Sequence, residues 1–341
     1  MAALIALLLL GLAGAAERCP PAREAVRWLS AKGAVAGRLI IYTSLDPEVI
    51  AAVKPELARR FPGLRIGWHQ AGSEQIVARL SAEVRAGRIM ADLLMVSEPS
   101  YYVHLKKQGL LLRYTSPYAI QVAAPRDPDG YWTSARISHM VIAYNKRILK
   151  VGEAPRRLSE LTRPVWNHQV LMPNPLLSGT AFNFVAAVTG RYGWVFFEDL
   201  RANRIQVEGG NSAITRKLLS GEFRLSILNQ ESVLKAKSRG EPLEMIYPED
   251  AVVMIPGPIA ILRTSRNPVA AKAVYDWWLS RPGQQAIVNG WMHSVRPDLP
   301  PPAGARPLPE LLPRAVPVDW EDVAAHMSRI KDTFSRIVLE R

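Results

Sequence analysis

The alternation of short apolar runs with amphipathic segments constrains the fold of this chain more than any other feature of its sequence. The run RLIIYTS at residues 38–44 predicts a buried strand, and residues 64–69 and 91–97 predict two more. Between and after them, apolar residues recur at helical spacing, first at Val49, Val53, Leu57 and Phe61, then over residues 73–84 and 101–108. A unit of this kind builds a mostly parallel sheet with helices on both faces.

The same alternation continues after a proline-rich stretch at residues 114–128, which we interpret as a crossover between domains. Further strands are expected at residues 138–145, 168–172, 204–208, 224–228 and 243–247, and further helices at 180–189, 194–201, 212–219, 267–279, 283–289 and 318–338, with one ending at Arg239. Residues 252–262 are extended, but Pro256-Gly257-Pro258 argues against a continuous central strand, so we interpret them as the return to the first domain. The fold class is α/β, with two lobes, hinge crossovers and an interdomain cleft.

The first residues are typical of an export signal. Residues 2–12 are almost wholly apolar and lead into Ala13-Gly14-Ala15-Ala16, a small-residue cleavage pattern. This run is shorter than the ~20 residues of a membrane span. No Lys or Arg precedes it, and a buried N-terminal helix is the alternative. We expect cleavage near Ala15 or Ala16 and a mature protein outside the cytoplasm.

These boundaries give a domain prediction. Residues 1–16 form the signal peptide, residues 17–120 with 257–300 form a discontinuous first lobe, and residues 121–256 form the second lobe. Residues 301–341 are a proline-rich segment and a C-terminal helix. The lone cysteine, Cys19, excludes an internal disulfide and a cysteine metal cage.

The charge of the chain favours an acidic partner. Its 341 residues include 43 Lys+Arg and 30 Asp+Glu, a net charge of +13. The basic residues are scattered and form no stripe with interleaved aromatics, so nucleic acid is not the expected partner. A small anionic solute and a solvated basic surface remain as interpretations.

Catalytic motifs are missing from the sequence. No GxxxxGK[ST], GxGxxG, HExxH or GxSxG pattern occurs, and the six His residues show no ligand spacing. Nothing pairs a nucleophile with a base. We therefore expect no catalytic residue, metal or cofactor, and interpret the chain as a binding protein, not an enzyme.

Polar residues gather where predicted strands end and helices begin, and such positions offer unpaired backbone N–H groups to an anion. The candidate ligand-binding residues are Thr43, Ser44, Ser73, Ser178, Gly179, Thr180, Asn211 and Asn229. Ser73 and Asn211 are expected N-caps, and an ordinary cap or turn is the alternative for each member of this set. Glu98, Glu231 and Asp46 are acidic residues at strand ends, which could bind a cation or sit in solvent. Asp250 is a further possible ligand-binding residue.

Taken in order, six stretches of the chain resemble a known family. They are LIIYTSLDPEV, ADLLMVSEPS, PLLSGTAFNFVAAV, GGNSAITRKLLSGE, GEPLEMIYPED and IAILRTSRNPVAAKAVYDWWLSRPGQQ, and they cover most of residues 38–290. The chain is similar to the periplasmic substrate-binding proteins of ABC importers, in the ferric-ion, sugar-phosphate and phosphonate-binding branch. The resemblance implies a type II two-lobe binding-protein fold whose lobes close on a ligand.

The resemblance also implies roles for individual residues. Ser178, Gly179, Thr180, Asn211 and Asn229 fall where ferric-binding relatives hold a synergistic phosphate. Glu98 matches the relatives' iron-binding Glu, Asp46 stands in place of their His, and Glu231-Ser232 replaces their tyrosine pair. The anion half of the site is therefore kept and the ferric half is not.

The function that follows is periplasmic capture of a small phosphate- or phosphonate-bearing solute. The protein would deliver it to an ABC permease and ATPase of the inner membrane, and we expect a monomer. Ser178, Gly179, Thr180 and Asn211 would cradle the anion, while Ser44, Ser73 and Glu98 would close from the other lobe. A ferric-ion carrier with a tyrosine-free site and a ligand-loaded periplasmic sensor are the alternatives.

Overall fold

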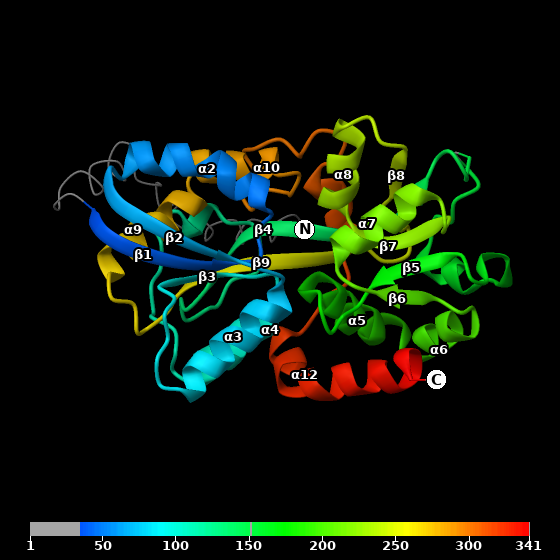
Figure 1. Ribbon diagram of the computed structural model, residues 1–341, viewed down its shortest axis with the longest axis horizontal. Helices are drawn as coiled ribbons and strands as arrows, with labels where there is room; N and C mark the ends of the chain where they lie inside the picture. Colours follow the sequence, from blue (N-terminus) through cyan, green and yellow to red (C-terminus); the bar gives the residue numbers. More distant parts are fainter. Residues whose placement is uncertain (1–34, 151, 341) are drawn as a thin grey trace, which may run out of the picture. The chain divides into compact units, whose positions relative to one another are not determined.

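Strands and helices alternate along the chain as the hydrophobic periodicity predicts (Figure 1). The computed structural model describes residues 35–150 and 152–340, so the predicted signal peptide, its cleavage site and Cys19 lie outside the described residues. The strands are β1 (Ala36–Thr43), β2 (Gly63–Gln70), β3 (Leu93–Met95), β4 (Thr133–Asn145), β5 (Val170–Pro173), β6 (Gln206–Glu208), β7 (Leu225–Asn229), β8 (Leu243–Ile246) and β9 (Val253–Ile261).

Helices follow most of these strands. They are α2 (Pro47–Arg60), α3 (Ser73–Arg85), α4 (Pro99–Lys107), α5 (Gly179–Tyr192), α6 (Val195–Ala202), α7 (Asn211–Ser220), α8 (Gln230–Ser238), α9 (Pro268–Leu279), α10 (Arg281–Asn289), α11 (Leu308–Leu311) and α12 (Trp320–Phe334). Short turns of 3-10 or π geometry are η1 (Ala119–Gln121), η2 (Leu158–Thr162), η3 (Pro164–Trp166), η4 (Leu312–Arg314) and η5 (Ser335–Leu339).

In the described part of the chain the strands form one sheet of nine, in the order β2-β1-β3-β9-β4-β7-β5-β6, with β8 beside β4. The β1–β2, β1–β3, β5–β6 and β5–β7 pairs are parallel, as βαβ units require. The pairs that involve β4 or β9 are antiparallel. Two parallel groups are therefore joined through the long antiparallel pair β4–β9, which gives the two-lobe α/β architecture predicted from the sequence.

Each parallel group is covered by helices on both faces. Side chains of β1 alternate between two hydrophobic clusters: Leu39 and Ile41 pack with α2, α9 and α10, and Tyr42 packs with α3 and α4. In the other group, one cluster involves α5 and α6 and another involves α7 and α8. These layers bury the apolar faces that the periodicity identified.

The strand β9 corrects the interpretation of residues 252–262. It continues through Pro256-Gly257-Pro258 and pairs with β4 from Val253 to Ile259, then with β3 at Ala260 and Ile261. The backbone N and C=O groups of successive residues in a strand point to opposite edges. A proline whose nitrogen points away from β4 therefore removes no hydrogen bond from the β4–β9 pairing. The Pro258 carbonyl accepts a hydrogen bond at 2.8 Å from the Tyr102 hydroxyl of α4, so this residue faces away from β4.

Three other expectations need correction. The strand predicted from Ser138 begins at Thr133 and so includes Arg136, because the polar residues at its start hide a strand whose side chains are all buried. The N-cap of α3 is Gly72 and the N-cap of α7 is Gly210, so Ser73 and Asn211 are each the first residue of a helix.

The C-terminal helix α12 packs against elements of both strand groups (Figure 1). It contacts α4 on one side and α5 on the other, and Val323 packs with Phe182 of α5. Lys331 of α12 forms an ion pair at 2.7 Å with Glu74 of α3, and Lys107 of α4 forms one at 2.7 Å with Glu321. The helix therefore links the two groups at a place separate from β4–β9. Within residues 35–340, apart from residue 151, no helix is long and apolar enough to cross a membrane.

Candidate functional site

A cleft of about 600 Å³ lies where the starts of four helices meet. It is lined by Gly72 and Ser73 at the start of α3, Gly179 and Thr180 of α5, Asn211 and Ser212 of α7, and Glu231 and Ser232 of α8. The first N–H groups of a helix have no partner within the helix, and the helix dipole makes its start electropositive. This arrangement favours a negatively charged guest.

Most of the predicted site residues line this cleft. They are Ser44, Asp46, Ser73, Ser178, Gly179, Thr180, Asn211, Asn229 and Glu231. Ser178 is also the N-cap of α5 and accepts from Ala181 N at 3.4 Å, so its cap role and its place in the cleft coexist. Asn211 Nδ2 donates to Thr180 Oγ1 at 2.9 Å, which ties the start of α7 to the start of α5.

Three predicted residues, Thr43, Asp250 and Glu98, do not line the cleft. The Thr43 hydroxyl is buried and bonds the Met95 carbonyl and the Leu45 amide, so it serves the turn after β1. Asp250 accepts from Leu158 N, Ser159 N and Ser159 Oγ, which places it at the start of η2.

Glu98 is fully buried behind the cleft, at the start of α4. One carboxylate oxygen accepts from Ser100 Oγ at 2.9 Å and the other has no hydrogen-bond partner among the described residues. Burial raises its pKa, the neighbouring Glu74 carboxylate raises it further, and Lys331 opposes both. Glu98 is thus a structural acid next to α3 and α12. The resemblance implied that its carboxylate faces the ligand, but Glu98 does not line the cleft.

Arg136, which the sequence patterns did not single out, lines the cleft and is only 2% exposed. Its Nη2 donates to Ser44 Oγ at 3.1 Å and to Ser97 Oγ at 3.1 Å. Its Nη1 is buried and has no hydrogen-bond partner in the described part of the chain. Burial lowers the pKa of Arg136, but a guanidinium stays protonated in proteins. The signal that could have found it is an arginine flanked by the apolar residues Ala135 and Ile137, shortly before the apolar run of the same strand.

Gly257 makes room for this guanidinium. A Cβ at Gly257 would lie 2.6 Å from Arg136 Cγ and 2.8 Å from its Nε. No real side chain would fit at such distances, so the arginine lies across the bare backbone of β9. The glycine between the two prolines is therefore explained by the side chain that crosses it.

Carboxylates and cations both line the rest of the cleft: Glu231 and Asp46 together with Arg216, Lys235 and Arg239. The Ser138 hydroxyl lies 2.7 and 2.6 Å from the two carboxylate oxygens of Glu231. Burial raises the pKa of Glu231, and the hydrogen bond from Ser138 opposes the rise. Asp46 lies nearer the mouth, where Lys235 of α8 pairs with it at 3.4 Å and also with Glu48. The cleft therefore has a buried cation at Arg136 and, away from it, carboxylates that lie among other cations.

The two strand groups touch at the start of α5. Asn183 Nδ2 donates to the Ser97 carbonyl at 2.8 Å. A Cβ at Gly179 would lie 2.6 Å from that carbonyl oxygen and 2.7 Å from Ser73 Cβ. Only a glycine allows α5 to come this close to Ser73 and Ser97.

The described residues offer little to a hard metal ion. Over residues 35–150 and 152–340, no group of three His, Cys, Asp or Glu is placed to hold a metal, and no tyrosine is among the residues that line the cleft. His139 and His293 are buried beside each other, with ring centroids 4.7 Å apart and pKa values lowered by burial. A smaller cavity of about 290 Å³ beside β8 contains none of the predicted site residues.

Comparison with known proteins agrees with this architecture. A family model described as bacterial extracellular solute-binding protein matches residues 89–324. An uncharacterized protein of Haemophilus influenzae is 23% identical over 262 residues, which covers 73% of this chain and 75% of that protein.

Solved structures share the fold. The periplasmic binding protein AfuA from Actinobacillus pleuropneumoniae, with exogenous fructose-6-phosphate bound, has a TM-score of 0.79 at 22% identity, covering 89% of this chain and 99% of that chain. Iron-bound HitA from Pseudomonas aeruginosa has a TM-score of 0.75 at 20% identity, covering 87% of this chain and 99% of that chain. At these identities the likeness concerns the fold.

Proposed function

Since the chain belongs to the family of bacterial extracellular solute-binding proteins, we propose that its cleft captures a small anionic solute that carries a phosphate or phosphonate group. Arg136 is the observation that carries this proposal. A buried guanidinium whose Nη1 lacks a partner costs free energy, about 1–3 kcal/mol or more. A tetrahedral oxyanion supplies the missing acceptor, and arginine is well suited to such groups.

The surroundings of Arg136 support the same group. Ser44 and Ser97 each accept a hydrogen bond from Nη2, so their own hydroxyl hydrogens stay available to a ligand oxygen. The starts of α3 and α5 lie in the same cleft and add backbone N–H groups. A phosphate-like group has enough oxygens to accept from an arginine, two hydroxyls and these amides.

Two carboxylates of the cleft select the part of the ligand that does not carry the phosphate group. Glu231 and Asp46 line the cleft and can accept hydrogen bonds from hydroxyl groups or an ammonium group. A sugar phosphate or an aminophosphonate presents an anion at one end and such donors at the other. Inorganic phosphate would fill only the Arg136 end and would bind more weakly.

In this proposal the protein makes and breaks no bond. The lobes proposed from the sequence, residues 17–120 with 257–300 and residues 121–256, close on the ligand by bending at β4 and β9. The closed protein then delivers its ligand in the periplasm to the permease and ATPase of an ABC importer in the inner membrane. The contact between Gly179 and Ser97 is the kind of contact that closure forms.

Isothermal titration of the mature protein tests the proposal. Glucose 6-phosphate, 3-phosphoglycerate and 2-aminoethylphosphonate are titrated against the wild type and against Arg136→Met, with glucose as the uncharged control. We expect saturable heat from at least one phosphorylated compound, none from glucose, and binding about 100-fold weaker in the variant. Binding of ferric ion without binding of any phosphorylated compound would favour the iron carrier instead. Native mass spectrometry of freshly purified protein supplies an independent check, because a retained solute is identified by its mass.

A further inference from the structure

The strand β4 has a bulge immediately before Arg136. Its register with β9 pairs Ser134 with Pro258 and Arg136 with Gly257, so Ala135 has no partner in β9. The side chains of Ala135 and Ile137 enter the hydrophobic cluster formed with α9 and α10. Because side chains alternate along a strand, Arg136 points to the opposite face, into the cleft. The direction of the guanidinium therefore depends on how this bulge is held.

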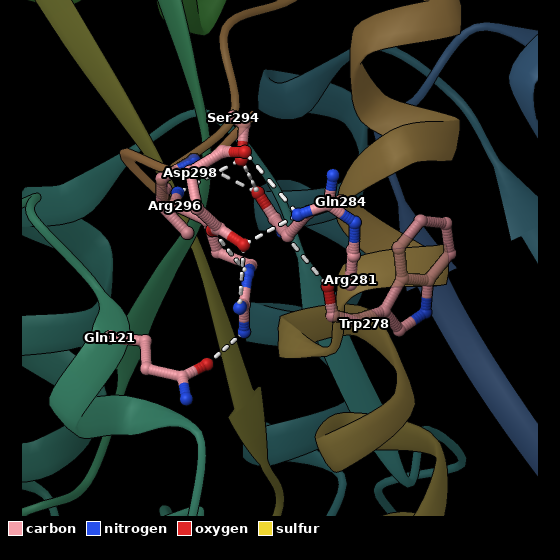
Figure 2. Close-up of polar contacts among 8 residues, drawn as sticks. Gln121, Trp278, Arg281, Gln284, Ser294, Arg296 and Asp298 are labelled. Carbon is pink, nitrogen blue, oxygen red and sulfur yellow. Dashed lines mark hydrogen bonds and ion pairs between the residues drawn. The ribbon is translucent and has the colours of Figure 1, made fainter. Parts of the chain in front are cut away.

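The buried side chain of Gln284 lies beside Trp278 and Ser294 (Figure 2), and it holds the bulge by a hydrogen bond to Ala135. Its Nε2 donates to the Ala135 carbonyl at 2.7 Å and to the Trp278 carbonyl at 2.8 Å. Its Oε1 accepts from Ser294 Oγ at 3.0 Å and from Val295 N at 2.9 Å. All four hydrogen-bonding positions of the amide are used, so the side chain has one orientation.

The neighbouring segment is itself anchored. Figure 2 shows Asp298 between Arg281 and Arg296, with ion pairs of 2.7 and 2.9 Å. His293 forms two backbone hydrogen bonds with Ile137, each of 3.0 Å. Residues on both sides of Arg136 are thus fixed along the same edge of β4, Ala135 by Gln284 and Ile137 by His293.

From these contacts we propose that Gln284 is the positioning residue of the anion site. It does not touch the cleft. It fixes the Ala135 carbonyl, and so aims the free Nη1 of Arg136 at the ligand. This inference rests on the proposed function of the cleft, because the ligand contact belongs to Arg136.

The test is a double-mutant cycle with Gln284→Met, which keeps the volume and removes all four hydrogen bonds. With the phosphorylated ligand found by titration, we expect Gln284→Met to weaken binding about tenfold in the wild-type background and less than about twofold in the Arg136→Met background. Ser294→Ala is the control, since it removes one bond to the same amide and leaves Ala135 untouched; we expect a change below about twofold. An equal loss in both backgrounds would overturn the proposal.

A second readout does not require the ligand. The Nε–H resonance of Arg136 is assigned in ¹⁵N-arginine-labelled protein by its absence in Arg136→Met. We expect Gln284→Met to shift or broaden this resonance and Ser294→Ala to leave it in place. If no phosphorylated compound binds the wild type, the proposed function fails while this spectrum still reports on positioning. An unchanged resonance in folded Gln284→Met contradicts the positioning role.

If Gln284→Met does not fold, Ala135→Gly replaces it. This variant keeps the glutamine and loosens the backbone at the bulge. We expect the same change in the Arg136 resonance, with a smaller loss of affinity than for Gln284→Met. A variant with wild-type affinity and a wild-type resonance would contradict the proposal.

Discussion

Arg136 and Glu98 are both buried, ionisable side chains near the cleft, and they differ in what surrounds them. The unpartnered nitrogen of Arg136 belongs to a residue that lines the cleft. The unpartnered oxygen of Glu98 is enclosed beside Glu74 and Lys331, away from the cleft. A buried ionisable side chain therefore indicates a binding site only where a ligand can reach it, and otherwise indicates a structural group with a perturbed pKa.

The largest expected effect separates these two residues by affinity. Arg136→Met removes the guanidinium at nearly constant volume, and we expect it to weaken binding of the phosphorylated ligand by about 100-fold, since truncating one partner of a buried charge pair costs about 2–5 kcal/mol. Glu98→Gln should change affinity by less than about twofold. Titration calorimetry measures both. Equal losses of affinity in the two variants would show that Glu98 contributes to binding as much as Arg136 does.

A smaller effect is expected where the strand groups touch. Gly179→Ala places a methyl group against the Ser97 carbonyl, so α5 must move away, and we expect roughly a tenfold loss of affinity. The matched control is Gly190→Ala in the same helix, where a Cβ meets no atom within 4 Å. That variant should bind normally and gain up to about 1 kcal/mol of stability. Normal binding by Gly179→Ala would contradict the need for this close approach.

The third prediction concerns the pH dependence of stability. Burial and Glu74 raise the pKa of Glu98 above its ordinary value of 4.5, so the folded chain keeps a proton there that the unfolded chain has lost. The stability that this proton provides is complete below pH 4.5 and is lost as the pH rises through the folded-state pKa. Glu98→Gln has no proton to lose at this position. The melting temperature of the variant minus that of the wild type should therefore increase as the pH rises.

Thermal melts of both proteins at pH 4, 5.5, 7 and 8.5 check this sign. Comparing the pair cancels the contributions of the other titrating groups. A difference in melting temperature that stays constant over this range would mean that Glu98 does not titrate differently in the folded and unfolded chains.

The smallest effect is expected at Asp250, an acid outside the cleft whose role is local. Asp250→Asn weakens the hydrogen bonds to Leu158 and Ser159 and should cost about 1 kcal/mol of stability. Ligand affinity should remain that of the wild type. A loss of affinity in titration, with the melting temperature unchanged, would reassign this residue to the binding machinery.

Much of the fold could be predicted because periodicity directly reports which face of an element is buried. The βαβαβ unit of residues 38–108 and the family resemblance are confirmed. The expectation that residues 252–262 form no continuous strand was wrong. Local proline chemistry does not reveal which edge of a strand is paired, and β9 pairs with β4 through the edge whose hydrogen-bonding groups its prolines leave intact.

The candidate site was predictable only in part. Serines, glycines and asparagines at helix starts follow from chain order, and most of these residues line the cleft. Arg136 was missed because its importance depends on a bulge and on Gly257 in another strand, and both are properties of tertiary structure. Glu98 was expected in the cleft because it follows a strand end, but its side chain is fully buried at the N-cap of α4 and accepts from Ser100 instead of lining the cleft.

The strands β4 and β9 each contribute side chains to hydrophobic clusters of both strand groups. Ile137 and Ile259 lie in a cluster with α2 and α9, and Met140 and Val253 lie in a cluster with α5 and α6. A fragment that carries only one of the two strand groups would either lack one strand of the β4–β9 pair or keep both strands and expose the apolar side chains that pack against the missing group. The chain should therefore unfold in a single cooperative transition, and a protease cut within either strand should abolish folding of both halves.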